Sequence, residues 1–247
     1  MVFADDLFMP RYRPLVSGDW ELQVVGLYPC RGYWSDLVMV ERMAALVRRG
    51  QCWMSMTPFE FESQETGVRL ARGHVLVFGL GMGWAAAACA ANPAVAAVTV
   101  VEKDPEVLAL HGELDLFAQL PEGARDKLRL VEGDAHCYAP DRPVDLMMPD
   151  IWLPLVSDSR VDEVRAMQDR VGAASIYFWG QEMELARRAV AAGRELDEAG
   201  IRATSEETGL PLAGPELDGY SGRLAVAARR WLRGRWLPGP APPAALA

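Results

Sequence analysis

The sequence has few of the residues that bind metal ions or form disulfides. Its 247 residues include four cysteines and three histidines, and neither type shows the paired spacing of a zinc or iron–sulfur site. The spacing therefore predicts no metal site. It also gives no reason to expect disulfides, so the expected location is a reducing compartment, the cytoplasm.

Long apolar runs and an excess of basic residues are also missing. The longest apolar region, from Trp84 to Val101, is interrupted by Asn92-Pro93, so it predicts a helix, a turn and a strand, and no membrane span. The chain has 25 Lys and Arg against 34 Asp and Glu, a net charge of −9. Because nucleic-acid affinity depends largely on neutralising phosphates, we expect no nucleic-acid partner and a small neutral or cationic one instead.

The most informative stretch begins with an apolar run from His74 to Phe78. Gly79, Gly81 and Gly83 follow it, and an alanine-rich segment begins at Trp84. The apolar run predicts a buried strand, and the glycines predict a tight turn whose backbone comes close to a ligand. The helix after the turn presents free N–H groups to it, so the stretch is typical of a nucleotide-binding edge.

A second strand indicates which nucleoside group binds there. The apolar run from Ala97 to Val101 ends in Glu102, about 20 residues beyond the glycines, where a doubly wound sheet binds a ribose. Trp84 does not suit the dinucleotide pattern counted from Gly79, but a count from Gly81 does fit. Dinucleotides and S-adenosylmethionine both remain open at this point.

Two further strand ends separate these cofactors. The third strand, from Leu128, closes on Gly133-Asp134-Ala135, and the fourth, from Val144, closes on Asp150-Ile151-Trp152. With these motifs in this order, the sequence resembles class I S-adenosylmethionine-dependent methyltransferases, and especially their spermidine-synthase-like branch. The likeness covers roughly residues 57–180.

The resemblance implies a role for each motif residue. It implies S-adenosylmethionine as the cofactor, with its methionine part near Gly79, Gly81 and Gly83 and its ribose on Glu102. It also implies that Asp134 accepts from the adenine amino group, beside Ala135. Asp150 falls where the spermidine-synthase-like branch keeps its catalytic acid.

An acceptor site is expected at the same edge of the sheet. Methyl transfer needs a group that takes up or orients the acceptor proton, and Asp150 is our candidate, with a structural cap on the following turn as the alternative. Trp152, Tyr177 and Trp179 are candidate walls of the acceptor pocket, although rings at these positions also fill cores.

The chain organisation follows from these motifs. We expect an α/β fold with a doubly wound, Rossmann-like, mostly parallel sheet over residues 57–236, beginning with a helix at Pro58. Residues 1–56 are expected to form an arm and a small accessory α/β region, with a strand over 21–28 and a helix from Ser35 to Arg49. A long helix is expected over 181–199, a further strand is considered over 201–208, and a basic helix over 224–236 could form a homodimer contact. Residues 237–247 are expected to be a disordered tail.

The expected function is methyl transfer to a small-molecule acceptor, with other functions left open. One alternative is an aminopropyltransferase-like enzyme. In that branch the stretch before the first strand carries a glutamine and an Asp-Glu pair, and here Glu60-Phe61 resembles only its end, since Phe59 replaces the first acid and the glutamine is not found. A non-catalytic cofactor-binding protein is a further alternative. A nicotinamide oxidoreductase is less favoured, because no Tyr-x-x-x-Lys proton donor is found.

Overall fold

The computed structural model describes residues 6–234, which form two β-sheets and the helices around them. The tail expected over 237–247 lies outside these residues, and the division into three regions stays a prediction. The first sheet has four antiparallel strands, in the order β1 (Leu15–Ser17), β2 (Trp20–Arg31), β3 (Leu37–Arg48) and β4 (Gln51–Ser55).

The helix expected from Ser35 to Arg49 is wrong, because strand β3 occupies this stretch. Cross-strand pairing explains the difference: β3 pairs antiparallel with β2 along its whole length, from Arg31–Leu37 at the hairpin end to Trp20–Arg48. Tertiary pairing of this extent overrides a weak helical preference. The accessory region is therefore a β-sheet, and the strand expected over 21–28 lies within β2.

The second, central sheet has five strands that are all parallel. Their order is β7 (Leu128–Glu132), β6 (Val95–Glu102), β5 (Gly73–Phe78), β8 (Leu146–Pro149) and β9 (Ser175–Ile176). The chain winds outward from β5 in both directions, so β5 marks the point where the strand order reverses. Ligands of open α/β sheets bind outside the carboxyl ends of the strands at this point. The expected doubly wound sheet is confirmed.

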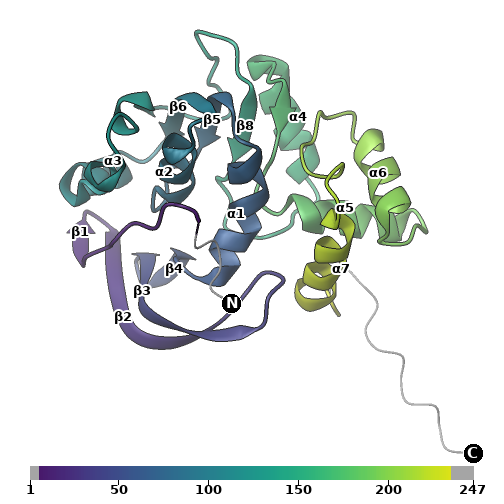
Figure 1. Cartoon of the computed structure of the whole chain (residues 1–247), viewed down its shortest axis with the longest axis horizontal. Helices are drawn as coiled ribbons and strands as arrows, with labels where there is room; N and C mark the ends of the chain where they lie inside the picture. Colours follow the sequence, from purple (N-terminus) through teal and green to yellow (C-terminus); the bar gives the residue numbers. More distant parts are fainter. Residues whose placement is uncertain (1–5, 235–247) are drawn as a thin grey trace, which may run out of the picture.

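Helices cover both faces of the central sheet (Figure 1). They are α1 (Pro58–Leu70), α2 (Trp84–Ala91), α3 (Pro105–Leu114), α4 (Arg160–Val171), α5 (Gln181–Ala191), α6 (Glu198–Glu207) and α7 (Tyr220–Trp231), with short 3-10 turns η1 (Leu116–Gln119) and η2 (Arg125–Lys127). Val75 and Val77 of β5 pack in one core with residues of α2 and α3, whereas Leu76 and Phe78 pack in another with residues of α4. The alternation of apolar side chains along a buried strand produces these two layers.

The C-terminal helices differ in part from the sequence expectations. The expected long helix ends at Ala191, and residues 201–208, considered as a strand, lie mostly in α6. After β9, the described part of the chain adds only an isolated bridge between Ile176 and Leu212 to the sheet. The basic helix is α7, which ends at Trp231. Within residues 6–234, no helix is both long enough and apolar enough to cross a bilayer.

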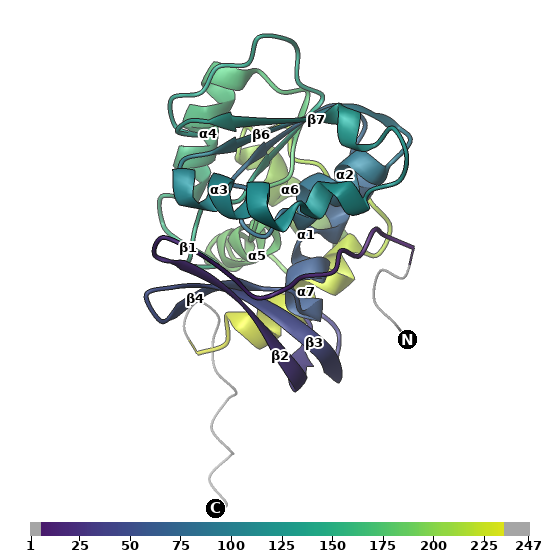
Figure 2. The same cartoon turned by 90° about the vertical axis from the view of Figure 1, so that its left-hand side faces the viewer.

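The antiparallel sheet lies beneath the central sheet in the view of Figure 2. Several hydrogen bonds join it and the preceding arm to the rest of the molecule. Among them, the Tyr12 hydroxyl donates to the Met82 carbonyl (3.0 Å), the Ser17 hydroxyl to the Glu106 carbonyl (2.8 Å), and the Trp20 indole N–H to the Asp104 carboxylate (2.9 Å). The N-terminal sheet is thereby held over the carboxyl edge of the central sheet.

Candidate functional site

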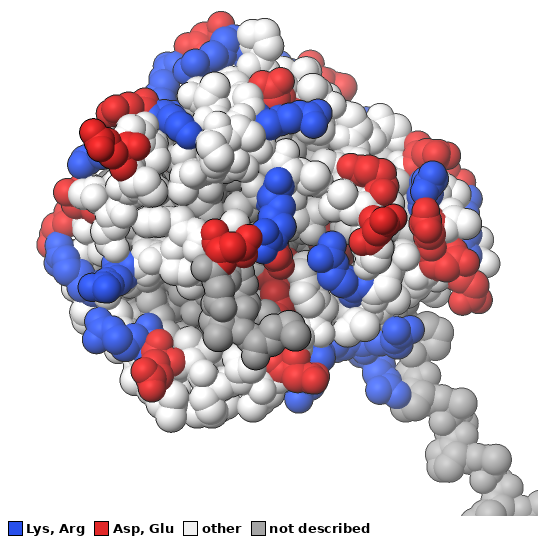
Figure 3. Space-filling view, in the orientation of Figure 1, with Lys and Arg blue, Asp and Glu red and all other residues white. Residues whose placement is uncertain are grey.

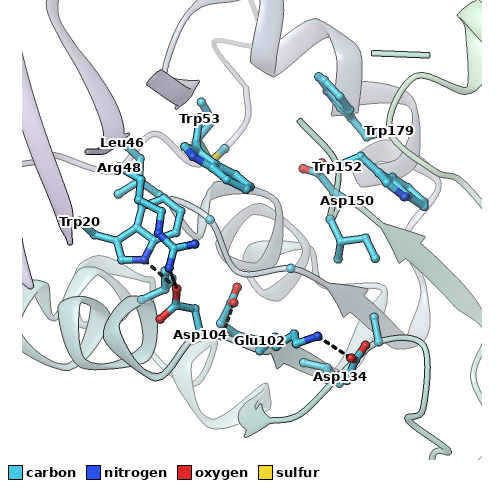
Figure 4. Close-up of a pocket in the computed structure, with 18 of the residues that line it drawn as sticks. Trp20, Leu46, Arg48, Trp53, Glu102, Asp104, Asp134, Asp150, Trp152 and Trp179 are labelled. Carbon is cyan, nitrogen blue, oxygen red and sulfur yellow. Dashed lines mark hydrogen bonds and ion pairs between the residues drawn. The ribbon is translucent and has the colours of Figure 1, made fainter. Parts of the chain in front are cut away.

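A cavity of about 640 Å³ lies where the two sheets face each other. This volume falls within the range of roughly 300–1,000 Å³ that is usual for small-molecule and cofactor sites. The lining residues follow the carboxyl ends of the five central strands or come from β2, β3, β4 and α1. The central strands contribute Gly79, Gly81, Glu102, Asp134, Ala135, Asp150, Trp152 and Trp179, and the N-terminal part contributes Trp20, Leu46, Arg48, Trp53, Met54 and Glu60 (Figure 4).

The glycine turn has a backbone that other residues would strain. Gly79, Gly81 and Gly83 all have positive φ angles, of 92°, 49° and 77°. A Cβ atom on Gly79 would lie 2.1 Å from the Asp150 carbonyl oxygen, so the turn can pack against the end of β8 only as glycine. Gly79 and Gly81 line the large cavity, whereas Gly83 lines a small cavity beside it and caps α2.

Glu102 lies at the end of β6 and faces this turn. One carboxylate oxygen accepts the Leu80 N–H (2.8 Å) and the other accepts the Asp104 N–H (2.8 Å). These bonds fix the carboxylate at the cavity wall, and each oxygen keeps a second lone pair. Glu102 therefore has the position and the free acceptor capacity to bind a ligand diol.

Asp134 follows β7 on the same wall. Its carboxylate pairs with the Lys103 ammonium (2.7 Å) and accepts the His136 N–H (2.9 Å). The hydrogen bond from Lys103 lowers the pKa of Asp134, with a smaller contribution from the His136 N–H, so the carboxylate stays ionised and accepts only. Ala135, beside it, is buried at the cavity surface.

A second acidic group lies on the opposite side of the cavity, between α1 and the end of β8. The side-chain amide of Gln64 donates one hydrogen bond to Glu60 (2.9 Å) and one to Asp150 (2.6 Å). Burial raises the pKa of both carboxyls, and the charge of Asp150 raises that of Glu60 further. Asp150 thus has a buried acidic neighbour that the strand pattern does not show.

Two tryptophans form the wall next to Asp150. The Trp152 indole N–H donates to Glu163 (2.6 Å), and the Trp179 indole N–H donates to the Ser63 hydroxyl (3.1 Å). The buried guanidinium of Arg160 links them, because it lies 3.9 Å from the centre of the Trp152 ring and donates to the Trp179 carbonyl (3.0 Å). Both rings therefore have fixed orientations at the cavity.

Tyr177 does not line this cavity, contrary to the sequence expectation. Its side chain is 1% exposed and packs in the core on the α1 side of the sheet. The hydroxyl bonds to the Ser63 carbonyl (2.8 Å) and to Glu182 (3.0 Å). Both rings lie on the α1 side, since both bond to Ser63, but Tyr177 directly follows β9 and lies within the core, whereas Trp179 lies two residues further along, at the carboxyl edge of the sheet.

The N-terminal sheet supplies the wall opposite Trp152 (Figure 4). The rings of Trp20 and Trp53 pack edge to face with centroids 5.4 Å apart, and the Arg48 guanidinium lies over Trp20 and pairs with Asp104 (3.3 Å). The Met54 sulfur accepts the Met82 N–H (3.1 Å). The cavity is thus closed partly by residues that no strand-end motif identifies.

Sequence reasoning also missed the residues that support the site from behind. The His111 imidazole bonds to the Gly81 carbonyl (2.9 Å) and is buried against Phe117, and burial lowers its pKa. Gln64 was missed as well, although it lies one helical turn from Glu60, and this spacing was the available signal for it. Within the described residues no group of three or more His, Cys, Asp or Glu could hold a metal ion. Acidic and basic side chains are interspersed over the face shown in Figure 3.

The chain matches no protein-family model and no curated protein sequence. Similar solved structures include the DhpI-SAM-HEP complex, at 22% identity over 50% of this chain and 56% of that chain, with a TM-score of 0.36. The glycopeptide N-methyltransferase MtfA complexed with (S)-adenosyl-L-homocysteine is another, at 23% identity over 44% of this chain and 43% of that chain, with a TM-score of 0.35. The chain spans about half the length of these structures. At TM-scores this low, the likeness does not indicate which reaction the chain performs or on which molecule.

Proposed function

We propose that the chain is an S-adenosylmethionine-dependent methyltransferase that acts on a small-molecule acceptor. The observation that supports the proposal most directly is the common cavity of Gly81, Glu102, Asp134 and Asp150. These residues come from four separate strand ends. Their common cavity supports a nucleoside site with a candidate base beside it.

The cofactor fits the residues that are present. When bound, S-adenosylmethionine supplies an electrophilic methyl group. Glu102 accepts hydrogen bonds from the ribose hydroxyls through its free lone pairs, and Asp134 accepts from the adenine amino group, with Ala135 against the ring. Gly79 and Gly81 leave room for the methionine part, since they carry no side chain into the cavity, and Gly83 shapes the same turn.

The acceptor is placed on the other side of the cavity. Trp152 and Trp179 hold it in line with the transferred methyl group and exclude water, which is the main task in a transfer of this kind. Asp150 takes up or orients the acceptor proton. The alternative role of Asp150 as a cap on the following turn has less support, because its carboxylate bonds to the Gln64 side chain of α1.

Binding measurements test the cofactor assignment. We expect isothermal titration calorimetry to show binding of S-adenosylmethionine and S-adenosylhomocysteine but not of NAD. Glu102→Ala should weaken that binding about 10- to 100-fold, because hydrogen bonds to a charged group contribute about 1.5–3 kcal/mol. Glu132→Ala is the matched control, since Glu132 pairs with Glu102 at the neighbouring strand end but does not line the cavity. If NAD binds and neither S-adenosylmethionine nor S-adenosylhomocysteine does, the proposal is refuted.

An aminopropyltransferase-like activity is the second candidate. It is favoured by Glu60 and Asp150, whose adjacent carboxyls would suit a cationic amine, and by Gln64, a glutamine close to both. Decarboxylated S-adenosylmethionine separates the two reactions. If it binds more tightly than S-adenosylmethionine and its aminopropyl group is transferred, methyl transfer is the wrong assignment.

A non-catalytic cofactor-binding protein is the third candidate, and transfer of a labelled methyl group distinguishes it. Incubation with methyl-labelled S-adenosylmethionine and a cell extract should label low-mass metabolites. Asp150→Asn should reduce the labelling about 100- to 10,000-fold without loss of cofactor binding. Equal labelling by this variant and the wild type would remove the catalytic role of Asp150. The cytoplasmic location and the homodimer stay predictions, for cell fractionation and sedimentation to test.

A further inference from the structure

The side-chain amide of Gln64 fixes two carboxyl groups at one point of the cavity. An amide nitrogen carries two protons, and here one is donated to the Glu60 Oε1 atom and the other to the Asp150 Oδ2 atom. Both protons are used, so one oxygen of each carboxyl is held at the same nitrogen. The other two oxygens, Glu60 Oε2 and Asp150 Oδ1, have no hydrogen-bond partner among the described residues, and both residues line the cavity.

Few opposite charges surround these carboxyls. Glu60 is 5% exposed, and the phenol of Tyr12 and the thiol of Cys52 are the titratable groups that face it from the N-terminal part. Arg160 of α4 is the cation that faces Asp150, and its terminal nitrogens already donate to the carbonyls of Trp179 and Pro154. If two adjacent carboxyls in such surroundings are both ionised, their repulsion costs much free energy.

We propose that Glu60 and Asp150 form a carboxyl pair that holds one proton between them, and that this pair binds and deprotonates an amino group of the methyl acceptor. The inference rests on the proposed methyl transfer and names its substrate class, an amine. It also makes Glu60 a second catalytic residue, with Gln64 as the positioning residue of the pair.

Charge and acidity both favour an amine. A pair that holds one proton carries one negative charge, which a protonated amine neutralises, and the rings of Trp152 and Trp179 at the same wall suit a cation. An ammonium group has a pKa of about 10.4, which a base with a raised pKa can approach. An aliphatic alcohol is far too weak an acid for the same base.

The step balances without another reactant. One carboxylate accepts a proton from the ammonium group, so the pair becomes neutral and the nitrogen gains a free lone pair. The nitrogen then forms a bond to the methyl carbon, and the carbon–sulfur bond breaks with its electron pair on sulfur. The products are a methylated ammonium ion and S-adenosylhomocysteine, and the pair afterwards releases its proton to solvent.

Titration of the side-chain carboxyl carbons tests the pair in the protein alone. In protein labelled with carbon-13 at the Asp and Glu carboxyls, NMR should show one of the two groups still protonated at pH 6. Asp150→Asn should lower the pKa of Glu60, because the neighbouring charge is gone. Glu65→Gln, on the same helix but paired with Arg69, is the control that should leave it unchanged. If both carboxyls of the wild type are ionised by pH 5, or if Asp150→Asn does not move Glu60, the pair does not exist.

Ligand binding tests the substrate class. Calorimetry with 2-phenylethylamine and 2-phenylethanol compares an amine and an alcohol of the same shape, both with and without S-adenosylhomocysteine. The amine should bind about tenfold more tightly or better, and Glu60→Gln should reduce this preference. Equal binding of the two probes refutes the amine assignment.

Cofactor binding tests the proposed function and carboxyl titration tests the pair, so either one can be refuted without the other. If S-adenosylhomocysteine does not bind but the carboxyls titrate as a pair, the proposed function is wrong and the pair remains. If the cofactor binds but both carboxyls titrate at ordinary pH, the proposed function remains and the pair is wrong.

Discussion

The substitution Glu182→Gln should change how the stability of the protein depends on pH. Glu182 is 1% exposed, at the start of α5, and its carboxyl faces the hydroxyls of Tyr177 (3.0 Å) and Tyr33 (3.3 Å). The Tyr177 hydroxyl has a single proton and also lies 2.8 Å from the Ser63 carbonyl, which can only accept. Tyr177 therefore donates to Ser63, and the Glu182 carboxyl is best placed to donate to Tyr177, as a protonated acid.

The magnitude follows from the pKa. Burial raises the pKa of Glu182 from 4.5 to about 7. The folded protein therefore keeps this proton up to about pH 7, whereas the unfolded chain releases it near pH 4.5. The resulting contribution to the free energy of unfolding is complete below pH 4.5 and is lost as the pH rises through 7. At 1.36 kcal/mol for each pKa unit, the loss is about 3 kcal/mol.

Urea unfolding between pH 4.5 and pH 8 measures this contribution. The Glu182→Gln variant keeps a donor for Tyr177 in its amide group but cannot ionise, so its stability should fall by about 3 kcal/mol less than that of the wild type. Glu60 and Asp150 titrate with the same sign in both proteins, and their contribution cancels in the difference.

An exposed glutamate of α6 provides the control for Glu182→Gln. Glu198→Gln removes an exposed carboxylate that pairs with Arg202 at the surface, and it should follow the wild-type curve closely. If the stabilities of wild type and Glu182→Gln fall in parallel with pH, then Glu182 is ionised in the folded protein. The hydrogen-bond assignment at Tyr177 would then be reversed.

The central sheet was predictable because each of its units is local in the sequence. An apolar run, a turn and a helix follow one another within about 30 residues in most units, the exception being β7, which a loop joins to β8. Parallel strands that are buried on both faces need such apolar runs. The side chains at the strand ends then fall along one edge. For this reason the positions of Gly79, Gly81, Glu102, Asp134 and Asp150 around one cavity could be anticipated.

The strand β3 shows what local pattern cannot decide. Leu37, Val40, Ala44 and Val47 have the spacing of one helix face, but the same residues also belong to a strand that is curved and buried mainly at one end. Their partner strand β2 lies earlier in the chain, and pairing with β2 favours a strand over a helix for these residues. A helical spacing of apolar residues is therefore weak evidence for a helix where the same residues can form a long β-hairpin.

The acidic half of the site was missed for a different reason. A polar residue on a helix is normally read as exposed, yet Glu60, Glu62 and Gln64 of α1 are all buried. Hydrogen bonds within α1 and to other elements meet part of their bonding capacity. Asp150 shares the Gln64 amide, and the N–H groups of residues 34 and 35 bind Glu62. Such partners are distant in the sequence and become visible only in the fold.

Two further substitutions test how the cavity wall is built. Gly79→Ala should lower the free energy of unfolding by about 1–3 kcal/mol more than Gly123→Ala in urea titrations, because both glycines have positive φ but only Gly79 would bring a Cβ against the Asp150 carbonyl; equal losses would show that the turn relaxes. Arg160 provides the second case, since its buried charge lowers the pKa of Asp150 while its face packs on Trp152. Arg160→Gln should therefore raise the pKa of Asp150 in a carbon-13 titration, whereas Arg160→Lys, which keeps the charge but loses the planar stacking, should leave it nearly unchanged. If both variants leave the titration of Asp150 unmoved, the arginine acts on the site through packing alone and its charge has no part in setting the acidity of the cavity.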